Sequence, residues 1–358
     1  MRKTITFLAI LAAVIACVLP ASAGENTAAL ATLFHKAIAN SEIQAKDASA
    51  FRLQAAVRVY GSNQKYLQGT VIEFWTPQGM LRRETLLQNY KQIEVSDGTS
   101  QWQQSSLGYV PYTVHELWSA LQFARRLQWW LSPVAGAAGG GIVAPRLAQV
   151  KATRLAGVLP PKGGLVCVQA SLSESYASEF CFERATGHLI TETDPDGVRY
   201  EYLAYAPFGD KSFPRVLRVI NDRGVELAEL RIQQLTAVEK PASSLFLPIA
   251  NVTPEGALSA CRSILPAKVV KRVPPVFPPA AREEGLSGTV VFYSYVGTDG
   301  VPRGLWPVKS SSTWFTTAAF QAASQWRYQP AACVEAGGAK RAIATPVYLS
   351  IPFTLQQQ

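Results

Sequence analysis

The residues with the greatest capacity for chemistry are four cysteines, Cys167, Cys181, Cys261 and Cys333. Their spacing is not that of paired Cys-x-x-Cys ligands, and the three histidines lie far apart, so we do not predict a zinc site. An even number of cysteines fits two disulfides if the chain is exported to an oxidising compartment. Cys167 and Cys181 lie in β-rich runs that could form a hairpin. We predict that they pair with each other and that Cys261 pairs with Cys333.

Export is indicated by residues 1–23. Two basic residues precede an apolar run, and the small residues Ala21-Ser22-Ala23 follow it, which is the arrangement of a signal peptide. We predict cleavage after Ala23. Two alternatives stay open, because Val14-Ile15-Ala16-Cys17 resembles a lipobox in which a lipidated Cys17 would anchor the protein, and because the leader could remain uncleaved as a membrane anchor.

No group of residues in the sequence predicts catalysis. Gly-x-Ser-x-Gly, His-Glu-x-x-His and a Walker lysine loop are absent from the sequence. His115-Glu116 opens a predicted helix, and we interpret it as a surface pair. Asp194-Pro195-Asp196-Gly197 lacks the later ligands of a calcium loop, and we interpret it as a hairpin turn. Arg125-Arg126 and Trp129-Trp130 share a helix whose other face is predicted core. We therefore predict no enzymatic activity, no cofactor and no metal.

The composition is that of a packed, folded protein. The chain has 358 residues, 48% of them apolar and 16% charged, which allows about two domains. Its 34 basic and 25 acidic residues give a formal charge of +9. The basic residues are scattered, so the charge does not indicate a nucleic-acid partner, and export makes one unexpected.

The N-terminal part of the chain has the pattern of a curved antiparallel sheet. A helix is predicted over residues 25–43, after which apolar and polar residues alternate over residues 51–60. Further β-rich runs, separated by turn residues, continue to about residue 238. A helix over residues 111–131 and a glycine-rich loop over residues 136–141 interrupt them. We expect the helices to cover the concave face of the sheet and to leave an apolar pocket.

Several segments of this region carry a family resemblance. They are Phe51 to Tyr60, Gly69 to Trp75, Arg82-Arg83-Glu84, Asp97-Gly98-Thr99, Ala185 to Leu189 and Ser243 to Phe246. In these segments the chain resembles the LolA/LppX superfamily of periplasmic lipoprotein carriers. The resemblance implies an open β half-barrel over residues 24–250, with an apolar cavity that holds a lipid or an acyl chain.

The C-terminal part carries a second and more specific resemblance, which follows a proline-rich linker predicted over residues 251–267. Its segments are Pro275 to Gly285, Gly288 to Val296, Thr298-Asp299-Gly300, Pro307 to Ser311 and Gln325 to Pro330. They resemble the TonB C-terminal domain over residues 268–356. The resemblance implies two helices on a three-stranded antiparallel sheet. Both parts together predict an α+β protein.

The TonB resemblance implies a function in the cell envelope. Members of the family bind a short segment of outer-membrane receptors as an added strand and couple those receptors to inner-membrane energy. In this chain the leader lacks the Ser-x-x-x-His pattern of the family, and no long proline-rich spacer follows it. Pro274, Pro275 and Val276 replace the receptor-contacting glutamines of some members. We therefore predict a periplasmic protein that binds outer-membrane or other envelope proteins, and we do not predict energy coupling.

The last strand is the part of the chain that we predict to bind the partner. Pro346 and Pro352 lie within the final β-rich run, and prolines are tolerated in edge strands, where they also prevent indiscriminate pairing. We predict that a partner segment adds to this edge. The residues predicted to bind it are Phe277, Val347, Tyr348, Leu349, Ser350 and Ile351. The alternative function is a carrier of a lipid or lipoprotein acyl chain in the LolA-like part.

Overall fold

The computed structural model describes residues 23–61, 65–135, 142–151, 163–174, 176–250, 252, 255–256 and 261–355. The predicted leader lies outside the described residues apart from Ala23, and so do Cys17 and the glycine-rich loop. No helix in these ranges combines the length and the apolar character that a membrane span requires.

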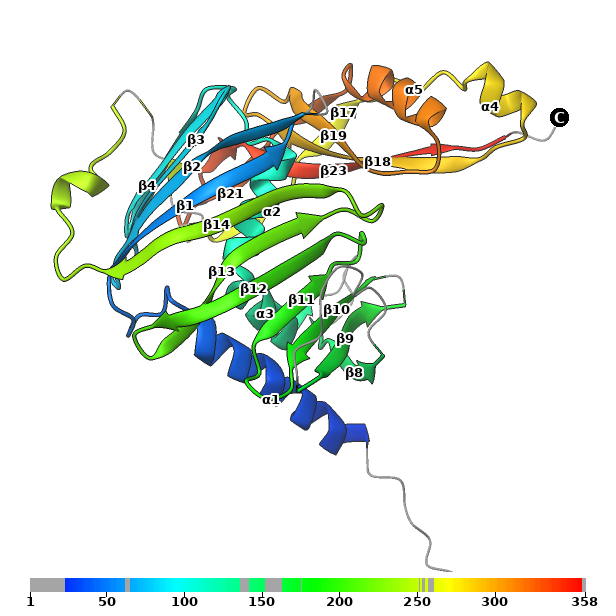
Figure 1. Cartoon of the computed structure of the whole chain (residues 1–358). Coiled ribbons are helices and arrows are strands. Elements are labelled where there is room, and N and C mark those ends of the chain that lie inside the picture. The colour runs from blue at the N-terminus through cyan, green and yellow to red at the C-terminus, as the bar shows by residue number, and fades with distance from the viewer. Residues whose placement is uncertain are drawn as a thin grey trace, which may run out of the picture.

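A 13-stranded antiparallel sheet dominates the structure and curves without closing on itself (Figure 1). Along the sheet the strands follow the order β15 (Glu255–Gly256), β5 (Ser100–Ser105), β4 (Tyr90–Asp97), β3 (Met80–Leu87), β2 (Tyr66–Trp75), β1 (Phe51–Tyr60), β14 (Glu226–Ala237), β13 (Lys211–Ile220), β12 (Arg199–Phe208), β11 (Leu189–Thr193), β10 (Tyr176–Glu183), β9 (Leu165–Ser173) and β8 (Arg146–Val150). Short elements beside it are β6 (Val134–Ala135), β7 (Ile142–Val143) and the 3₁₀ turn η2 (Ser243–Phe246).

Three helices cover the concave face of this sheet. They are α1 (Ala23–Ser41), α2 (Tyr112–Leu121) and α3 (Phe123–Leu131). The single helix predicted over residues 111–131 is therefore wrong, because the chain breaks at Gln122, whose φ is −97° and ψ is 26°. The break allows α2 to pack on β1, β13 and β14 while α3 packs on α1.

The concave face is filled by side chains. Phe34 of α1 lies 5.0 Å from Phe180 and 5.1 Å from Phe182, measured between ring centroids, and all three rings are fully buried. Phe123 of α3 packs on Tyr202 and Phe213 in the same way. Every second residue of β1 is buried, so one face of this strand contributes its side chains to the core, as the sequence predicted. In the described part of the half-barrel, apolar side chains thus occupy the place where the carrier alternative expects an acyl chain.

The C-terminal part forms a small fold with its own three-stranded sheet, shown in yellow, orange and red in Figure 1. Its main sheet has three antiparallel strands in the order β19 (Pro302–Ser310), β18 (Gly288–Val296) and β23 (Thr345–Phe353). Two helices, α4 (Pro279–Glu283) and α5 (Thr313–Ala323), complete it, and the predicted fold class is confirmed. Smaller pairings join β17 (Lys268–Lys271) to β20 (Arg327–Gln329), and β21 (Ala331–Val334) to β16 (Ser263–Leu265) and β22 (Lys340–Ile343).

The segment predicted as a linker, residues 251–267, contains two of these strands. β15 pairs with β5 of the large sheet, and β16 pairs with β21 of the C-terminal part. The segment is therefore held by strand pairing to the large sheet through β15 and to the C-terminal part through β16.

The two parts share a core. Tyr293 of β18 is fully buried, and its ring lies 5.1 Å from Tyr112 of α2 and 5.2 Å from His115. Trp306 of β19 stacks on Tyr112 at 5.8 Å. Gly304 lies so close to Tyr109 that a Cβ at this position would be 2.5 Å from the Tyr109 ring. The face of the small sheet opposite α5 thus packs on the half-barrel.

Candidate functional site

The last strand, β23, is an edge strand. It pairs with β18 from Gly288 opposite Phe353 to Val296 opposite Thr345. On its other side no strand of the described residues pairs with it, so the predicted edge is confirmed.

The free edge of β23 offers only two backbone donors between its prolines. Successive residues of a strand direct their N–H and C=O groups to opposite edges. Pro346 and Pro352 lack an N–H, and their even positions belong to the free edge. Tyr348 and Ser350 lie between them at the other even positions. In the ranges described above, neither of these two amides donates a hydrogen bond to the backbone of a turn or a loop. A partner strand could bind here over a short stretch.

The residues predicted to bind a partner lie on two faces of the small sheet. Val347, Leu349 and Ile351 face α5, and the last two are buried in the C-terminal core. Tyr348 and Ser350 are exposed and face away from α5. Phe277 packs on Phe315 and Phe353 in the α5-side core, so the structure does not bring it together with Tyr348.

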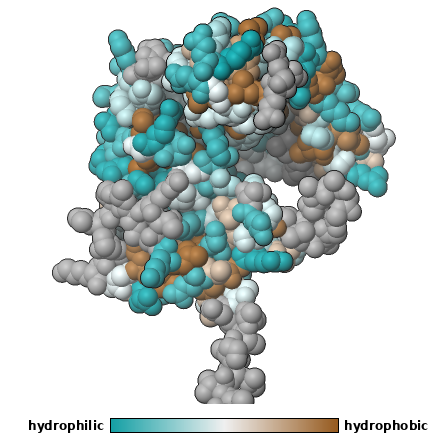
Figure 2. All heavy atoms as spheres, turned by 90° about the vertical axis from the view of Figure 1, so that its right-hand side faces the viewer, coloured by the Kyte–Doolittle hydropathy of each residue, from teal (hydrophilic) through white to brown (hydrophobic). Residues whose placement is uncertain are grey.

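Tyr348 lines a cleft of about 520 Å³ between the C-terminal part and the half-barrel. The rest of the lining comes from α2, α3, the start of β10, the strands β11 and β12, and the turn between those two strands. Its aromatic residues are Trp129, Trp130, Tyr176, Tyr200 and Tyr348, and its acidic residues are Glu116, Glu192, Asp194 and Asp196. Figure 2 looks onto this side of the molecule, where the surface is hollowed between the C-terminal part above and the half-barrel below.

Hydrogen bonds and one ion pair fix the floor of the cleft. Arg126 forms an ion pair with Glu192 at 2.7 Å and donates to the Tyr202 hydroxyl at 2.6 Å. The Tyr200 hydroxyl donates to the Glu116 carboxylate. Both carboxylates are almost completely buried, and burial raises the pKa of Glu192 while Arg126 counteracts the rise.

The turn at the rim of the cleft is the hairpin turn predicted from the sequence. Asp194 accepts backbone hydrogen bonds from Asp196 at 3.0 Å and from Val198 at 2.8 Å. Gly197 has a φ of 85°, which favours glycine. Burial, followed by the nearby charge of Glu116, raises the pKa of Asp194 well above its ordinary value.

Sequence reasoning missed the acidic part of this cleft. Glu116 was expected at the surface but is 3% exposed: its carboxylate accepts a hydrogen bond from Tyr200, and its neighbour His115 packs on Tyr293 of the C-terminal part. The contacting residues lie more than 80 positions away in sequence, so local patterns carry no signal of this burial. By contrast, the sequence already placed Arg126, Trp129 and Trp130 together on one helix, and all three line the cleft.

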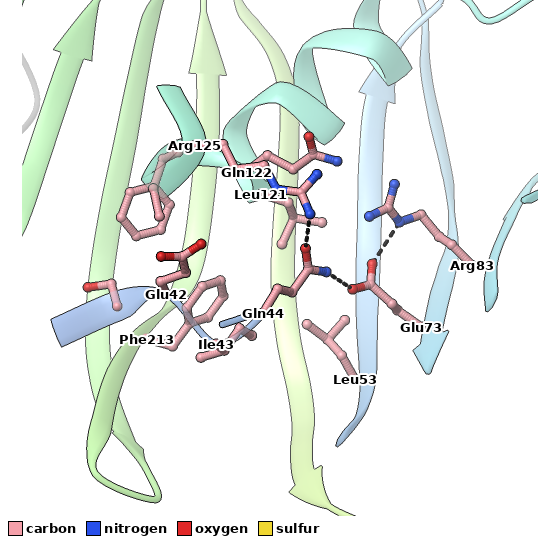
Figure 3. A pocket seen from close by; sticks show the side chains of 13 residues that line it. Glu42, Ile43, Gln44, Leu53, Glu73, Arg83, Leu121, Gln122, Arg125 and Phe213 are labelled. Carbon is pink, nitrogen blue, oxygen red and sulfur yellow. Dashed lines mark hydrogen bonds and ion pairs between the residues drawn. The ribbon is translucent and has the colours of Figure 1, made fainter. Parts of the chain in front are cut away.

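A second, much smaller cavity of about 30 Å³ lies where α1 ends beside the junction of α2 and α3 (Figure 3). Glu73 accepts from Arg83 Nε at 2.7 Å and from Gln44 at 2.8 Å. Arg83 also stacks on Trp118 and pairs with Glu94 at 3.2 Å. A cavity of this size holds about one water molecule and is too small for an acyl chain. The hydrogen bonds of Glu73 join the segment after α1 to β2 and β3.

Both predicted disulfides are present. Cys167 bonds to Cys181 across the β9–β10 hairpin, and Cys261 bonds to Cys333 beside the β16–β21 pair. The Glu179 carboxylate also lies close to the first pair, but bonded sulfurs do not supply the thiolates that a metal site needs.

We expect the Cys261–Cys333 bond to contribute more stability than the Cys167–Cys181 bond, because it closes a loop with a sequence separation of 72 residues and the other closes one of 14. Loop-closure entropy gives about 4 and about 3 kcal/mol, respectively. Urea unfolding of the Cys261→Ser/Cys333→Ser and Cys167→Ser/Cys181→Ser variants measures both. A Cys167→Ser/Cys181→Ser variant that is as unstable as the Cys261→Ser/Cys333→Ser variant, or less stable, would contradict this prediction.

Comparison with known proteins gives the following similarities. No curated protein matches the chain. An outer membrane lipoprotein-sorting protein domain from Vibrio parahaemolyticus is 11% identical with a TM-score of 0.36, over 62% of this chain and 97% of that one. A LolA superfamily protein from Nitrosomonas europaea is 10% identical with a TM-score of 0.35, over 61% and 97%.

The C-terminal part has similarities of its own. The solution structure of the TonB CTD from Pseudomonas aeruginosa is 25% identical with a TM-score of 0.22, over 26% of this chain and 89% of that one. Residues 273–352 match the family model described as Gram-negative bacterial TonB protein C-terminal, so this part of the chain carries the sequence pattern of that family, as predicted.

Proposed function

We propose that this chain is a non-enzymatic periplasmic protein whose C-terminal part binds an extended segment of an outer-membrane transport protein or another envelope protein. The observation that carries the proposal is the free edge of β23, with the amides of Tyr348 and Ser350 between two prolines. The family match of residues 273–352 supports an envelope protein of the TonB type.

Strand addition explains why the edge combines two prolines with two free donors. Pro346 and Pro352 limit pairing to a short stretch, which protects the edge from unspecific association. Between them, a partner can form backbone hydrogen bonds with Tyr348 and Ser350. The core-facing residues Val347, Leu349 and Ile351 keep the strand in register while the partner binds.

The packed concave face of the half-barrel favours this proposal over the carrier alternative. Phe34, Phe123 and Phe180 are fully buried where an acyl chain would lie. Binding through the C-terminal edge needs no rearrangement of that core.

The decisive variant is Ser350→Pro, with Ser350→Ala as its matched control. Both remove the exposed hydroxyl, but only proline removes the outward N–H, and proline fits an edge strand that already holds two. Peptides are first selected from a display library on the full chain. We expect a selected peptide to bind the Ser350→Ala variant as it binds the native chain and the Ser350→Pro variant at least about tenfold more weakly, because a hydrogen bond is lost and the ring obstructs the edge.

Isothermal titration of the three proteins with the same synthetic peptide measures the effect, and circular dichroism verifies that each is folded. Unchanged affinity for a folded Ser350→Pro variant would show that peptides bind elsewhere. Failure to select any peptide on the full chain would also argue against the proposal.

A further inference from the structure

We infer that the cleft beside β23 accepts a basic side chain, arginine or lysine, from the residue of the partner strand that lies opposite Tyr348. The inference rests on the proposed strand addition and names the chemistry of the partner. It follows from the position of the cleft, from its charge and from its aromatic walls.

The position follows from the geometry of paired strands. Side chains of directly opposite residues lie on the same face of a sheet, with Cβ atoms about 5 Å apart. Tyr348 directs its side chain into the cleft, away from α5. A residue paired with Tyr348 on the free edge therefore also directs its side chain toward the cleft, which has room for a long side chain.

The charge of the lining favours a cation. Its four carboxylates face one guanidinium, that of Arg126, which is already paired with Glu192, and one imidazole, that of His115. Within the described residues, Glu116, Asp194 and Asp196 form no ion pair with any basic side chain. The cleft is therefore an acidic site on a chain with a formal charge of +9. A basic side chain would supply the missing countercharge.

The walls of the cleft offer aromatic faces to that cation. Trp129 is 40% exposed, Tyr176 is 45% exposed and Tyr348 is 53% exposed, although large aromatic side chains usually bury more of their surface. Tyr176 stacks on Trp130 at 5.9 Å and meets Trp129 at 6.5 Å. Exposed aromatic rings beside carboxylates are a favourable environment for guanidinium and ammonium groups.

The test compares two peptides that differ in charge alone. The first is acetyl-Thr-Val-Thr-Arg-Thr-Val-Thr-amide, and the second carries citrulline, a neutral isostere, in place of arginine. Each is labelled with fluorescein and titrated into the full chain by fluorescence anisotropy. We expect the arginine peptide to bind at least about tenfold more tightly. Raising the salt concentration should reduce this difference.

Substitutions of single carboxylates test whether the cleft causes the preference for the arginine peptide. Asp196→Asn changes an exposed carboxylate of the cleft, and Glu116→Gln changes a buried one. We expect each to reduce the preference for arginine by about threefold or more. Asp222→Asn, in the exposed turn after β13, removes the same charge outside the cleft and should leave the preference unchanged. Because Glu116 is buried, the Asp196→Asn result keeps the test valid if the Glu116→Gln variant does not fold.

The outcomes separate this inference from the proposed function. If both peptides bind equally and the Ser350→Pro variant loses both, strand addition stands and the basic side chain is wrong. If arginine is still preferred by the Ser350→Pro variant, the cleft binds the cation but strand addition is wrong. If neither peptide binds the native chain, both are contradicted.

Discussion

Replacing Glu73 by leucine should lower the free energy of unfolding by about 3–5 kcal/mol, because the variant leaves the buried Arg83 guanidinium without its main partner. Both side chains of this pair are 4% exposed, and the distance from Arg83 Nε to the Glu73 carboxylate is 2.7 Å. Gln44, which donates to the same carboxylate, would lose its partner as well (Figure 3). The midpoint of urea unfolding measures the loss.

The chain supplies a matched control for this variant in the neighbouring pair of Arg82 and Glu84. That pair is also an arginine and a glutamate on the same sheet, but its side chains are 24% and 31% exposed. Water can solvate Arg82 when its partner is removed, so Glu84→Leu should cost about 1 kcal/mol or less. Equal destabilisation by the two variants would contradict the account of Glu73 as the partner of a buried charge.

Replacing Tyr293 by alanine should have a comparably large effect, because this residue joins the C-terminal part to the half-barrel. Its ring is fully buried against Tyr112 and His115. Removal of a buried aromatic ring typically costs about 3–5 kcal/mol. We expect the Tyr293→Ala variant to unfold at lower urea concentration and its C-terminal part to become sensitive to proteases.

The control for Tyr293 is the phenylalanine variant. The Tyr293 hydroxyl is buried and has no hydrogen-bond partner among the residues that the structure describes. Removing it leaves the ring in place and relieves an unsatisfied polar group, so Tyr293→Phe should be as stable as the native chain or more stable. A loss of stability in the phenylalanine variant as large as in the alanine variant would mean that the hydroxyl, and not the ring, holds the interface.

Local patterns in the sequence were sufficient to predict several features. The alternation in β1 gave its buried face, and the two prolines of β23 indicated an edge. The cysteine pairs followed from an even count and from the β-rich runs around Cys167 and Cys181, which form the β9–β10 hairpin. These features depend on neighbouring residues or on simple counting.

The features that the sequence did not predict arise from contacts between distant segments. Glu116 is buried and bonded to Tyr200, and its neighbour His115 packs on Tyr293, and neither tyrosine is near Glu116 in sequence. The shared core had one available signal, because β18 is apolar at both odd and even positions from Val290 to Tyr293. Such a run is typical of a strand that is covered on both faces. The helix break at Gln122 has no comparable signal in the residue types.

The amide protons of Tyr348 and Ser350 test the central claim most directly. Hydrogen exchange of the full chain, followed by NMR with and without a saturating peptide selected on that chain, reports on each backbone N–H. We predict that the peptide slows exchange at Tyr348 and Ser350 at least about tenfold, because a strand added at the free edge would accept their hydrogen bonds. Leu349, whose N–H lies on the β18 side, should change little. Unchanged exchange at both Tyr348 and Ser350 in the peptide-bound protein would contradict strand addition at β23.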